Sequence, residues 1–564
     1  MKNYYTSFLF LFLLTLLSCQ QTPPDQSTKR VIIRERSDAS TLNPIGAGDQ
    51  LSVYAGQQIY QSLLSIDYKT EKIVGIIAES APDIELRADQ KMILTYTIRP
   101  EARFDNGRSI SSHDILFSLK LNICPLINNM GGVFYYEFIE DFIIKNERQF
   151  QIICKNAVVL NQFRSGDFAI MPPETYDSTG LLSSFSLKRL KQDKQLQEND
   201  SIILLSESVN NSINQSTPKY FVGSGAYQLK KWQKAERIIL ERKKNWWGKK
   251  LEGENSFFNA FADEIQFEII NDPVTAINAL KAKQIDFMYS LNAKDYLKLK
   301  DHESIETKSI QQHGYQYLGF NCNDPILSDK NVRKAIEACI PYDKIIEIVF
   351  KNEAIINRLP LALSMKSLRN TSIHFEGYNL EMAKKILTES GWKDTDGDNI
   401  LDKQNTALQL SYYYNSGNED RKSIGLLLQN ELKKLGVILE VKSLEWTSYL
   451  KALRNNEIQI FMNGSISVPL PPDFSSTFHS KFANGGRNYA NYQNPHLDTL
   501  IDSINIELNE VKRIELIKEA QVLIAEETPY VFLVTTNTRM AYSNRLQNVP
   551  IYSIRPNFWA PEIY

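Results

Sequence analysis

A short acidic loop at residues 394–402 has the residue spacing of a calcium-binding loop. Its carboxylates occupy loop positions 1, 3, 5 and 9 and belong to Asp394, Asp396, Asp398 and Asp402. Oxygen ligands at such intervals hold Ca²⁺. Asn399 stands where glycine is usual and tolerates a left-handed backbone, whereas Asn405 replaces the glutamate expected at position 12. The pattern indicates an incomplete calcium site, and a solvated acidic turn is the alternative.

A cysteine close to the amino terminus is a candidate for lipid attachment. It ends the run Leu16-Leu17-Ser18-Cys19, which looks like a lipobox. The apolar stretch before it is too short for a membrane-spanning helix, which needs roughly 20 residues. We therefore expect residues 1–19 to be a lipoprotein signal peptide, Cys19 to be lipidated, and residues 20–29 to be a flexible tether. The protein would be exported and lipid-anchored in the cell envelope; a plain secretory signal is the alternative.

The histidines and cysteines of the chain stand in no sequence motif that is typical of a catalytic site. The six histidines are His113, His302, His313, His374, His479 and His496. None stands in a GxSxG or HExxH motif, and no Cys/His spacing indicates zinc. Cys322 and Cys339 lie in apolar surroundings typical of buried free thiols. We expect no enzyme activity and no required cofactor, with a secreted hydrolase as the alternative.

Composition limits the class of protein. The chain has 564 residues, of which 43% are hydrophobic and 23% charged, with a net charge of −2. This composition is typical of globular proteins. The length implies more than one lobe, because single hydrophobic cores stop growing near about 250–300 residues. A near-neutral charge argues against nucleic acid as a partner, since phosphate binding needs a basic excess.

The stretch from residue 94 to residue 120 predicts a strand, a turn and a capped helix. Leu94, Tyr96 and Ile98 alternate with threonines, which is the pattern of a half-buried strand. Residues 105–107 are Asp-Asn-Gly, a turn sequence. Ser111 followed three residues later by Asp114 predicts a capping box at the start of a helix.

The same periodicities predict further elements and an α/β fold. Strands are expected at 31–33, 227–232, 237–242, 263–269, 314–323, 437–441 and 529–534, with a hairpin over 139–158. Helices are expected at 54–64, 272–283, 329–340, 380–391, 424–435, 495–508 and 511–526. The polar segment 188–211 is expected to be an exposed insertion.

Several blocks of the sequence resemble sequence blocks of one protein family, and they occur in the same order as in that family. TYTIRPEARFDNGRSISSHDILFSLK at residues 95–120 resembles the signature of the family 5 extracellular solute-binding proteins. FVGSGAYQLKKWQKAERIILERKKNWW at 221–247 and NYANYQNPHLD at 488–498 resemble two further blocks. These proteins are the oligopeptide-, dipeptide- and nickel-binding lipoproteins that feed ABC importers.

The resemblance implies a two-lobed periplasmic-binding-protein fold of the class II-like type with an extra small domain. Lobe one would comprise residues 30–46, 201–314 and 525–564, and would therefore be discontinuous. The additional small domain would take residues 47–200 and lobe two residues 315–524. Two crossing strands would join the lobes, and a monomer would close on its ligand by a hinge motion and deliver it to ABC permease subunits.

The resemblance also implies the ligand-binding positions. In the family they follow an LDP loop and lie in a GW-x-x-D segment of lobe two. The matching residues here are Gly48, Asp49 and Gln50, and Gly464, Ser465, Ile466, Ser467 and Val468. The family aspartate that holds a peptide amino group is replaced by Val468, and the tryptophan by Ser465.

These replacements leave the identity of the ligand open. A peptide or peptide-like small solute is expected, either without a free ammonium group or anchored by Asp49 instead. A nickel or metal-chelate ligand is an alternative, with His479 as the only histidine near the lobe-two segment. A receptor that uses the same fold for signalling, without transport, is another alternative.

Overall fold

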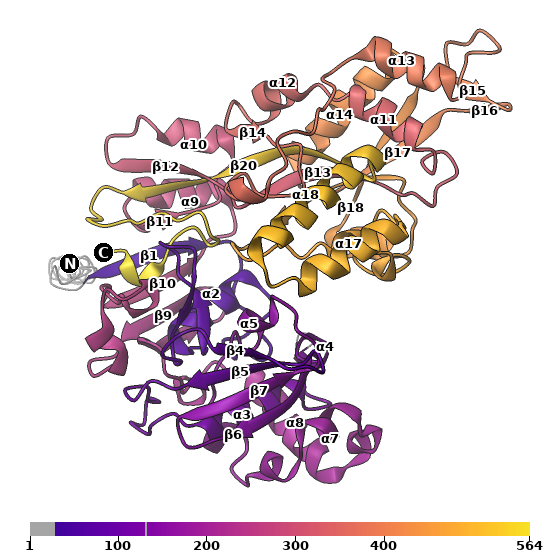
Figure 1. The fold of residues 1–564 in the computed structure, drawn as a ribbon. Helices are drawn as coiled ribbons and strands as arrows, with labels where there is room; N and C mark the ends of the chain where they lie inside the picture. The colour runs from indigo at the N-terminus through magenta and orange to yellow at the C-terminus, as the bar shows by residue number, and fades with distance from the viewer. Residues whose placement is uncertain (1–28, 130–131) are drawn as a thin grey trace, which may run out of the picture.

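The computed structural model describes residues 29–129 and 132–564, which form a mixed α/β protein with one large sheet, one four-stranded small sheet and two two-stranded sheets (Figure 1). The large sheet has 12 strands, and its main path runs β18-β17-β19-β13-β20-β11-β1-β10-β9-β8. The α/β prediction is confirmed. Among the described residues, no helix combines the length and apolar character needed to cross a membrane.

One half of the large sheet is built from the beginning and middle of the chain. It contains β1 (Arg30–Glu35), β8 (Tyr227–Gln233), β9 (Arg237–Arg242), β10 (Glu264–Ile269) and β11 (Phe287–Met288). The other half contains β13 (Gly314–Phe320), β17 (Gln409–Asn415), β18 (Ile438–Leu444) and β19 (Ile460–Ile466). We call these halves lobe one and lobe two.

Two segments cross between the lobes. The long strand β20 (Tyr530–Ser543) pairs with β13 in lobe two through its first residues and with β11 in lobe one through its last. Beside it, β12 (Ile305–Gln311) pairs with the lobe-one end of β20, and the chain passes through Gln312 and His313 into β13. The short β14 (Ala354–Ile356) also pairs with β20. The connection between the lobes is therefore narrow.

The small sheet is antiparallel and lies at the bottom of Figure 1. Its order is β4 (Asp83–Leu86), β5 (Met92–Thr97), β7 (Gln149–Cys154) and β6 (Ile139–Ile144). It packs with α3 (Ser112–Ile123), which begins with the predicted capping box of Ser111 and Asp114. Its apolar side chains belong to the same hydrophobic cluster as those of β1, β8 and β10.

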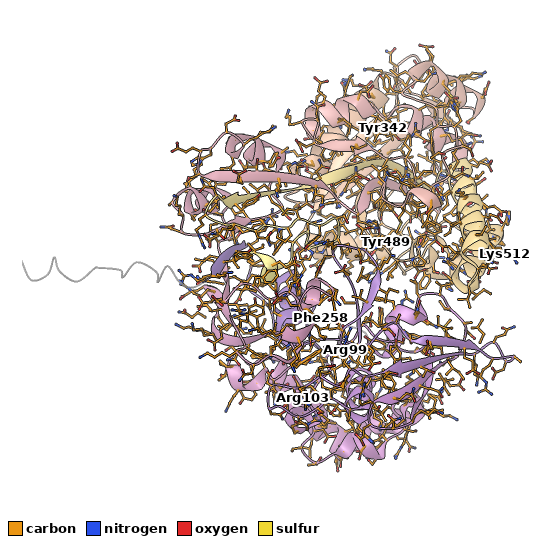
Figure 2. All side chains as sticks on the ribbon, turned by 60° about the vertical axis from the view of Figure 1, so that its left-hand side comes forward. Arg99, Arg103, Phe258, Tyr342, Tyr489 and Lys512 are labelled. Carbon is orange, nitrogen blue, oxygen red and sulfur yellow. The ribbon has the colours of Figure 1, made fainter. Side chains whose placement is uncertain are left out.

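A cation–π contact also connects the small sheet with lobe one. The guanidinium of Arg99, just after β5, lies 5.2 Å from the ring centroid of Phe258, and the two residues lie close together in Figure 2. Arg99 also forms an ion pair of 3.1 Å with Glu254. The shared core and these contacts make the small sheet an extension of lobe one.

Helices cover both faces of the lobe-two sheet. One cluster of buried side chains includes residues of α11 (Lys330–Ala338), α13 (Leu380–Glu389) and α14 (Glu419–Lys433). A second includes residues of α15 (Trp446–Arg454), α17 (Pro495–Ile506) and α18 (Glu510–Glu527). In lobe one, α9 (Pro273–Lys281) and α10 (Ala293–Leu299) contribute to a separate cluster.

Three predicted elements differ from the structure. The helix expected at 54–64 is α2 (Gln50–Ile59), because the chain turns into β2 (Leu64–Ile66), which pairs with β3 (Ile73–Gly75). The segment 188–211 is not simply exposed: it contains α8 (Asp200–Ile213), which buries Ile202, Leu205 and Val209 on one face. The strand expected at 529–534 continues to Ser543 because its second half pairs with lobe one.

Candidate functional site

The end of β19 and the segment that follows it form one wall of a cleft between lobe two and the small sheet. Ser465, Ile466, Ser467 and Val468 line a cavity of about 360 Å³. Four of the five predicted lobe-two residues are thus brought together on this wall. The fifth, Gly464, pairs with Gln316 of β13, and a Cβ there would lie within 2.7 Å of the Gln316 side chain.

This wall is apolar where it faces the cavity. Ile466 and Val468 line the cavity and are 47% and 43% exposed, so their apolar side chains are open to a ligand. Proline and aromatic side chains continue the surface; they include Tyr315, Pro360, Pro471, Pro472 and Phe474. Such a wall suits the uncharged parts of a ligand, because ligand cavities are lined mainly by apolar groups with a few polar ones.

The opposite wall carries polar side chains from the small-sheet region. Arg164 donates to the Asp473 carboxylate of lobe two at 3.1 Å and lies over the Tyr135 ring. The hydroxyls of Tyr135 and Tyr136 both donate to Asp167, and burial raises the pKa of Asp167 to about 6. The Arg164–Asp473 pair therefore joins the two walls of the cleft.

Two further cavities adjoin the first near the crossing segments. One, of about 500 Å³, is lined by Glu71, His313, Lys366 and Arg513 and shares Leu470 with the first cavity. The other, of about 70 Å³, is lined by residues that include Tyr289, His313, Ile466 and Arg555. Because they share lining residues, the three cavities are neighbours beside the hinge, and we refer to them together as the cleft.

His313 is the histidine at the centre of this region. It lies between β12 and β13, is 2% exposed, and has Nδ1 2.7 Å from the Ser364 hydroxyl. Its Nε2 has no hydrogen-bond partner among the described residues. Burial lowers the pKa of His313, and the negative charge of Glu71 and an interaction with the Val468 backbone oppose that effect only in part. The imidazole is therefore neutral at pH 7.

His479, the histidine that the sequence placed near the cleft, directly follows the lining residues Thr477 and Phe478 but lines none of the three cavities itself. Its Nδ1 is 3.3 Å from a carboxylate oxygen of Asp498 and its Nε2 is 3.5 Å from one of Asp502. It also accepts a hydrogen bond from the backbone N–H of Lys481. These contacts give His479 a structural environment, and the expectation that it is the only histidine near the cleft segment is wrong.

The predicted lobe-one residues have different surroundings. Asp49 is the N-cap of α2 and accepts hydrogen bonds from the backbone N–H and hydroxyl groups of both Ser40 and Ser52. Partial burial would raise the pKa of Asp49, but these hydrogen bonds outweigh burial and lower it. Gly48 precedes this cap and is exposed. Ligand contacts by Gly48 and Asp49 stay a prediction.

Gln50 connects to the cleft through other side chains. Its amide donates to the Tyr289 hydroxyl at 2.6 Å and accepts from Arg555. Tyr289 in turn donates to the buried carboxyl of Glu35 at 2.8 Å. Tyr289 and Arg555 line the smallest cavity. Gln50 thus orients two residues of the cleft.

The acidic loop brings three of its four carboxylates together. Ligand oxygens of Asp394, Asp396 and Asp398 lie within 4.8 Å of one another on the surface. Asp402 is outside this group, and its carboxylate accepts from the backbone N–H of Thr395 at 2.9 Å and from the Thr395 hydroxyl at 2.7 Å. Calcium binding stays a prediction with three ligands, not four. Cys19 lies outside the described residues.

Comparisons with known proteins agree on one family. The family model described as bacterial extracellular solute-binding proteins, family 5 Middle, matches residues 72–486. The oligopeptide-binding protein AppA of Bacillus subtilis is 25% identical over 525 residues, which are 92% of this chain and 88% of that protein.

Solved structures share the fold. The structure of AppA from Bacillus subtilis in complex with a nonapeptide has a TM-score of 0.71 and 22% identity, covering 95% of this chain and 98% of that chain. The structure of NikZ from Campylobacter jejuni in complex with Ni(L-His) has a TM-score of 0.73 and 19% identity, covering 95% and 99%. The two-lobed architecture is therefore that of these binding proteins.

Proposed function

Because the chain belongs to the bacterial extracellular solute-binding proteins of family 5, we propose that it captures a peptide or peptide-like solute between its lobes for an ABC permease. The observation that carries this proposal is the cleft formed by these three neighbouring cavities, whose walls come from lobe two, the small-sheet region and the crossing segments. The largest of its cavities, about 500 Å³, is within the range of about 300–1,000 Å³ that is typical of small-molecule sites.

The action is binding and closure, without turnover. A ligand that touches both walls has more contacts when the cleft is closed, so it shifts the population toward the closed form. A permease that recognises the closed form then receives only loaded protein. The narrow connection through β20 and the β12–β13 junction is a suitable hinge.

Mass spectrometry of small molecules that co-purify with the protein tests this function. We expect short peptides or peptide-like compounds, and we expect the same compounds to bind again after removal and titration. Conversion of the added peptides into products would contradict a binding protein. Purified protein that neither carries nor binds peptides would contradict the peptide proposal.

A metal chelate is the second candidate ligand, favoured by the unpartnered Nε2 of His313. In the part of the chain that the structure describes, the only group of three close potential metal ligands is the surface group Asp394, Asp396 and Asp398. A metal in the cleft would therefore have to arrive with its own chelator. Metal analysis of the purified protein separates this candidate from a peptide.

We also propose that the protein is held at the membrane by lipid on Cys19. Replacing Cys19 with serine removes the thiol to which the lipid would be attached, so the variant should be unprocessed or released as soluble protein. Membrane fractionation with measurement of the mature mass checks this. Processed Cys19→Ser protein that still sediments with membranes would contradict the anchor.

A further inference from the structure

The cleft contains one carboxylate that forms no ion pair with the described residues and whose surroundings fix its position. Of the acidic side chains that line its cavities, Asp473 is paired with Arg164. Glu510 is exposed in the first turn of α18. Glu71 accepts a hydrogen bond from the Ser553 hydroxyl. Of the two cleft carboxylates without an ion pair, Glu71 is therefore the one whose side chain is held in place.

The backbone holds Glu71 in an unusual conformation. It lies in the turn between β2 and β3 with φ of 58°, a left-handed value that is uncommon outside glycine, asparagine and aspartate. Its N–H donates to the Asp67 carbonyl at 2.9 Å, and the Asp67 carboxylate accepts from the backbone N–H groups of Thr70 and Ser256, both at 2.9 Å. Strained residues held by their surroundings cluster at functional sites.

His313 lines the same cavity as Glu71 and complements it. Since the imidazole is neutral, it does not repel a cation that approaches Glu71. Its Nε2 is buried without a partner, which is costly unless a ligand or water satisfies it. Glu71 belongs to the β2–β3 turn on the lobe-one side and His313 to the hinge segment between β12 and β13, so one ligand group in this cavity can contact both.

The charges in this cavity also fit a zwitterion. Besides Glu71 it is lined by Glu510, Lys366 and Arg513. An ammonium and a carboxylate on one ligand would each find a side chain of opposite charge. By contrast, the lobe-two position Val468 offers only an apolar surface.

We propose that Glu71, oriented by Ser553 and accompanied by His313, binds the ammonium group of the ligand in place of a lobe-two carboxylate. The inference rests on the proposed function, because a free peptide supplies that ammonium at its amino terminus. It assigns the amine anchor to the β2–β3 turn, on the lobe-one side of the cleft.

A pair of peptide mixtures tests this anchor on the full mature protein. One mixture contains free tetrapeptides without lysine or arginine, and the other contains the same peptides acetylated at the amino terminus. Wild type should bind the free mixture about 10- to 100-fold more tightly, the factor expected for a hydrogen bond to a charged group. Glu71→Gln and Glu71→Asn should both abolish this preference.

The variants are chosen to separate binding from folding. Asparagine suits the left-handed backbone at position 71, so Glu71→Asn should keep the wild-type melting temperature. Glu85→Gln is the matched control, because Glu85 lies on the exposed edge strand β4 and lines none of the cleft cavities described above. It should keep the full preference for free peptides.

Two results would overturn the inference, and they are distinguishable. If wild type and both Glu71 variants prefer free peptides equally, the anchor lies elsewhere while the peptide function stands. If wild type itself binds neither mixture, the peptide function fails and the anchor fails with it.

Discussion

The fold changes the protonation of the buried Glu35 carboxyl, because burial raises its pKa. Glu35 ends β1, is 6% exposed, and accepts from the Tyr289 hydroxyl at 2.8 and 2.9 Å. Burial raises the pKa of Glu35 from 4.5 to about 7, which outweighs the lowering by Tyr289 and Arg34. The folded protein therefore holds a proton here that the unfolded chain releases at lower pH.

The sign of the resulting pH dependence follows from this shift. The folded pKa is above the unfolded value, so the stabilisation is complete below pH 4.5 and is lost as the pH rises through about 7. The variant Glu35→Gln should not lose stability in this way, because glutamine has no proton to release in this pH range. Between pH 4.5 and 8, wild type should lose about 3 kcal/mol of unfolding free energy relative to Glu35→Gln, measured by urea unfolding. Parallel pH profiles of the two proteins would contradict the prediction.

The three clustered aspartates of the acidic loop lead to a second prediction. Millimolar Ca²⁺ added after chelator treatment should raise the melting temperature by a few °C, since a ligand at ten times its Kd contributes about 1.4 kcal/mol. Asp396→Asn should remove the shift because it removes one of the three ligands. Asp402→Asn should retain it, because Asp402 is bonded to Thr395. An unshifted wild type would exclude the calcium site.

At the scale of elements, the start of α3 depends on Asp114. This carboxylate is 2% exposed and accepts from the Ser111 N–H at 2.8 Å and from Arg108 at 2.9 and 3.0 Å. Asp114→Ala should lower the unfolding free energy by about 2–4 kcal/mol, because it removes the cap and leaves donors unpaired. Thermal or urea unfolding measures this loss.

The matched control for this cap is Glu174, which binds the same arginine at 3.0 Å but is 47% exposed at its side chain. Glu174→Gln should cost less than about 1 kcal/mol, as exposed ion pairs generally do. Equal losses for the two variants would show that the pairing with Arg108, and not the helix cap, determines the stability.

Elements with local signals were predictable from the sequence. The strands expected at 227–232 and 237–242 are β8 and β9 almost to the residue, because alternating side chains and the turn between them lie close together in the chain. The long extent of β20 was missed, since its second half is fixed by pairing with β11 and β12, distant in sequence. The end of α2 was missed for the same reason, because β3 takes the following residues into a hairpin.

The site divides in the same way. Ser465–Val468 could be placed on the cleft because they match the GW-x-x-D segment of the family that the sequence resembles. The role of Asp49 had a local signal too, since an aspartate before a helix with serine three residues on is a typical N-cap. Glu71, His313 and Ser553 could not be grouped from the sequence, because only the tertiary fold brings these distant positions together.

At the scale of the whole molecule, few polar contacts hold lobe two against the small-sheet region. Besides the Arg164–Asp473 pair, the backbone N–H of Val159 donates to the carbonyl of Asn505 at 2.9 Å. Both contacts lie far along the chain from the hinge at Gln312 and His313. Because few of the polar contacts between the described residues cross here, little polar bonding has to be broken when the two parts move apart for ligand entry and release.

The Arg164–Asp473 pair therefore sets part of the balance between closed and open forms. Its side chains are 32% and 30% exposed, so breaking it should change the closed-to-open ratio by at most about fivefold, or 1 kcal/mol. Asp473→Asn and Arg164→Gln should each increase the radius of gyration of the ligand-free protein in small-angle X-ray scattering. Ligand affinity should fall by no more than this factor, since the apparent affinity scales with the closed fraction.

A charge exchange and a control pair separate this effect from general loss of charge. The double variant Arg164→Asp with Asp473→Arg restores an ion pair of opposite polarity, so it should recover the compact form. Arg189 and Asp193 form a pair of the same length, 3.1 Å, at α7 (Leu187–Gln192) without crossing the cleft. Arg189→Gln should leave the radius unchanged. If it expands the protein as much as Arg164→Gln, the crossing pair does not control closure.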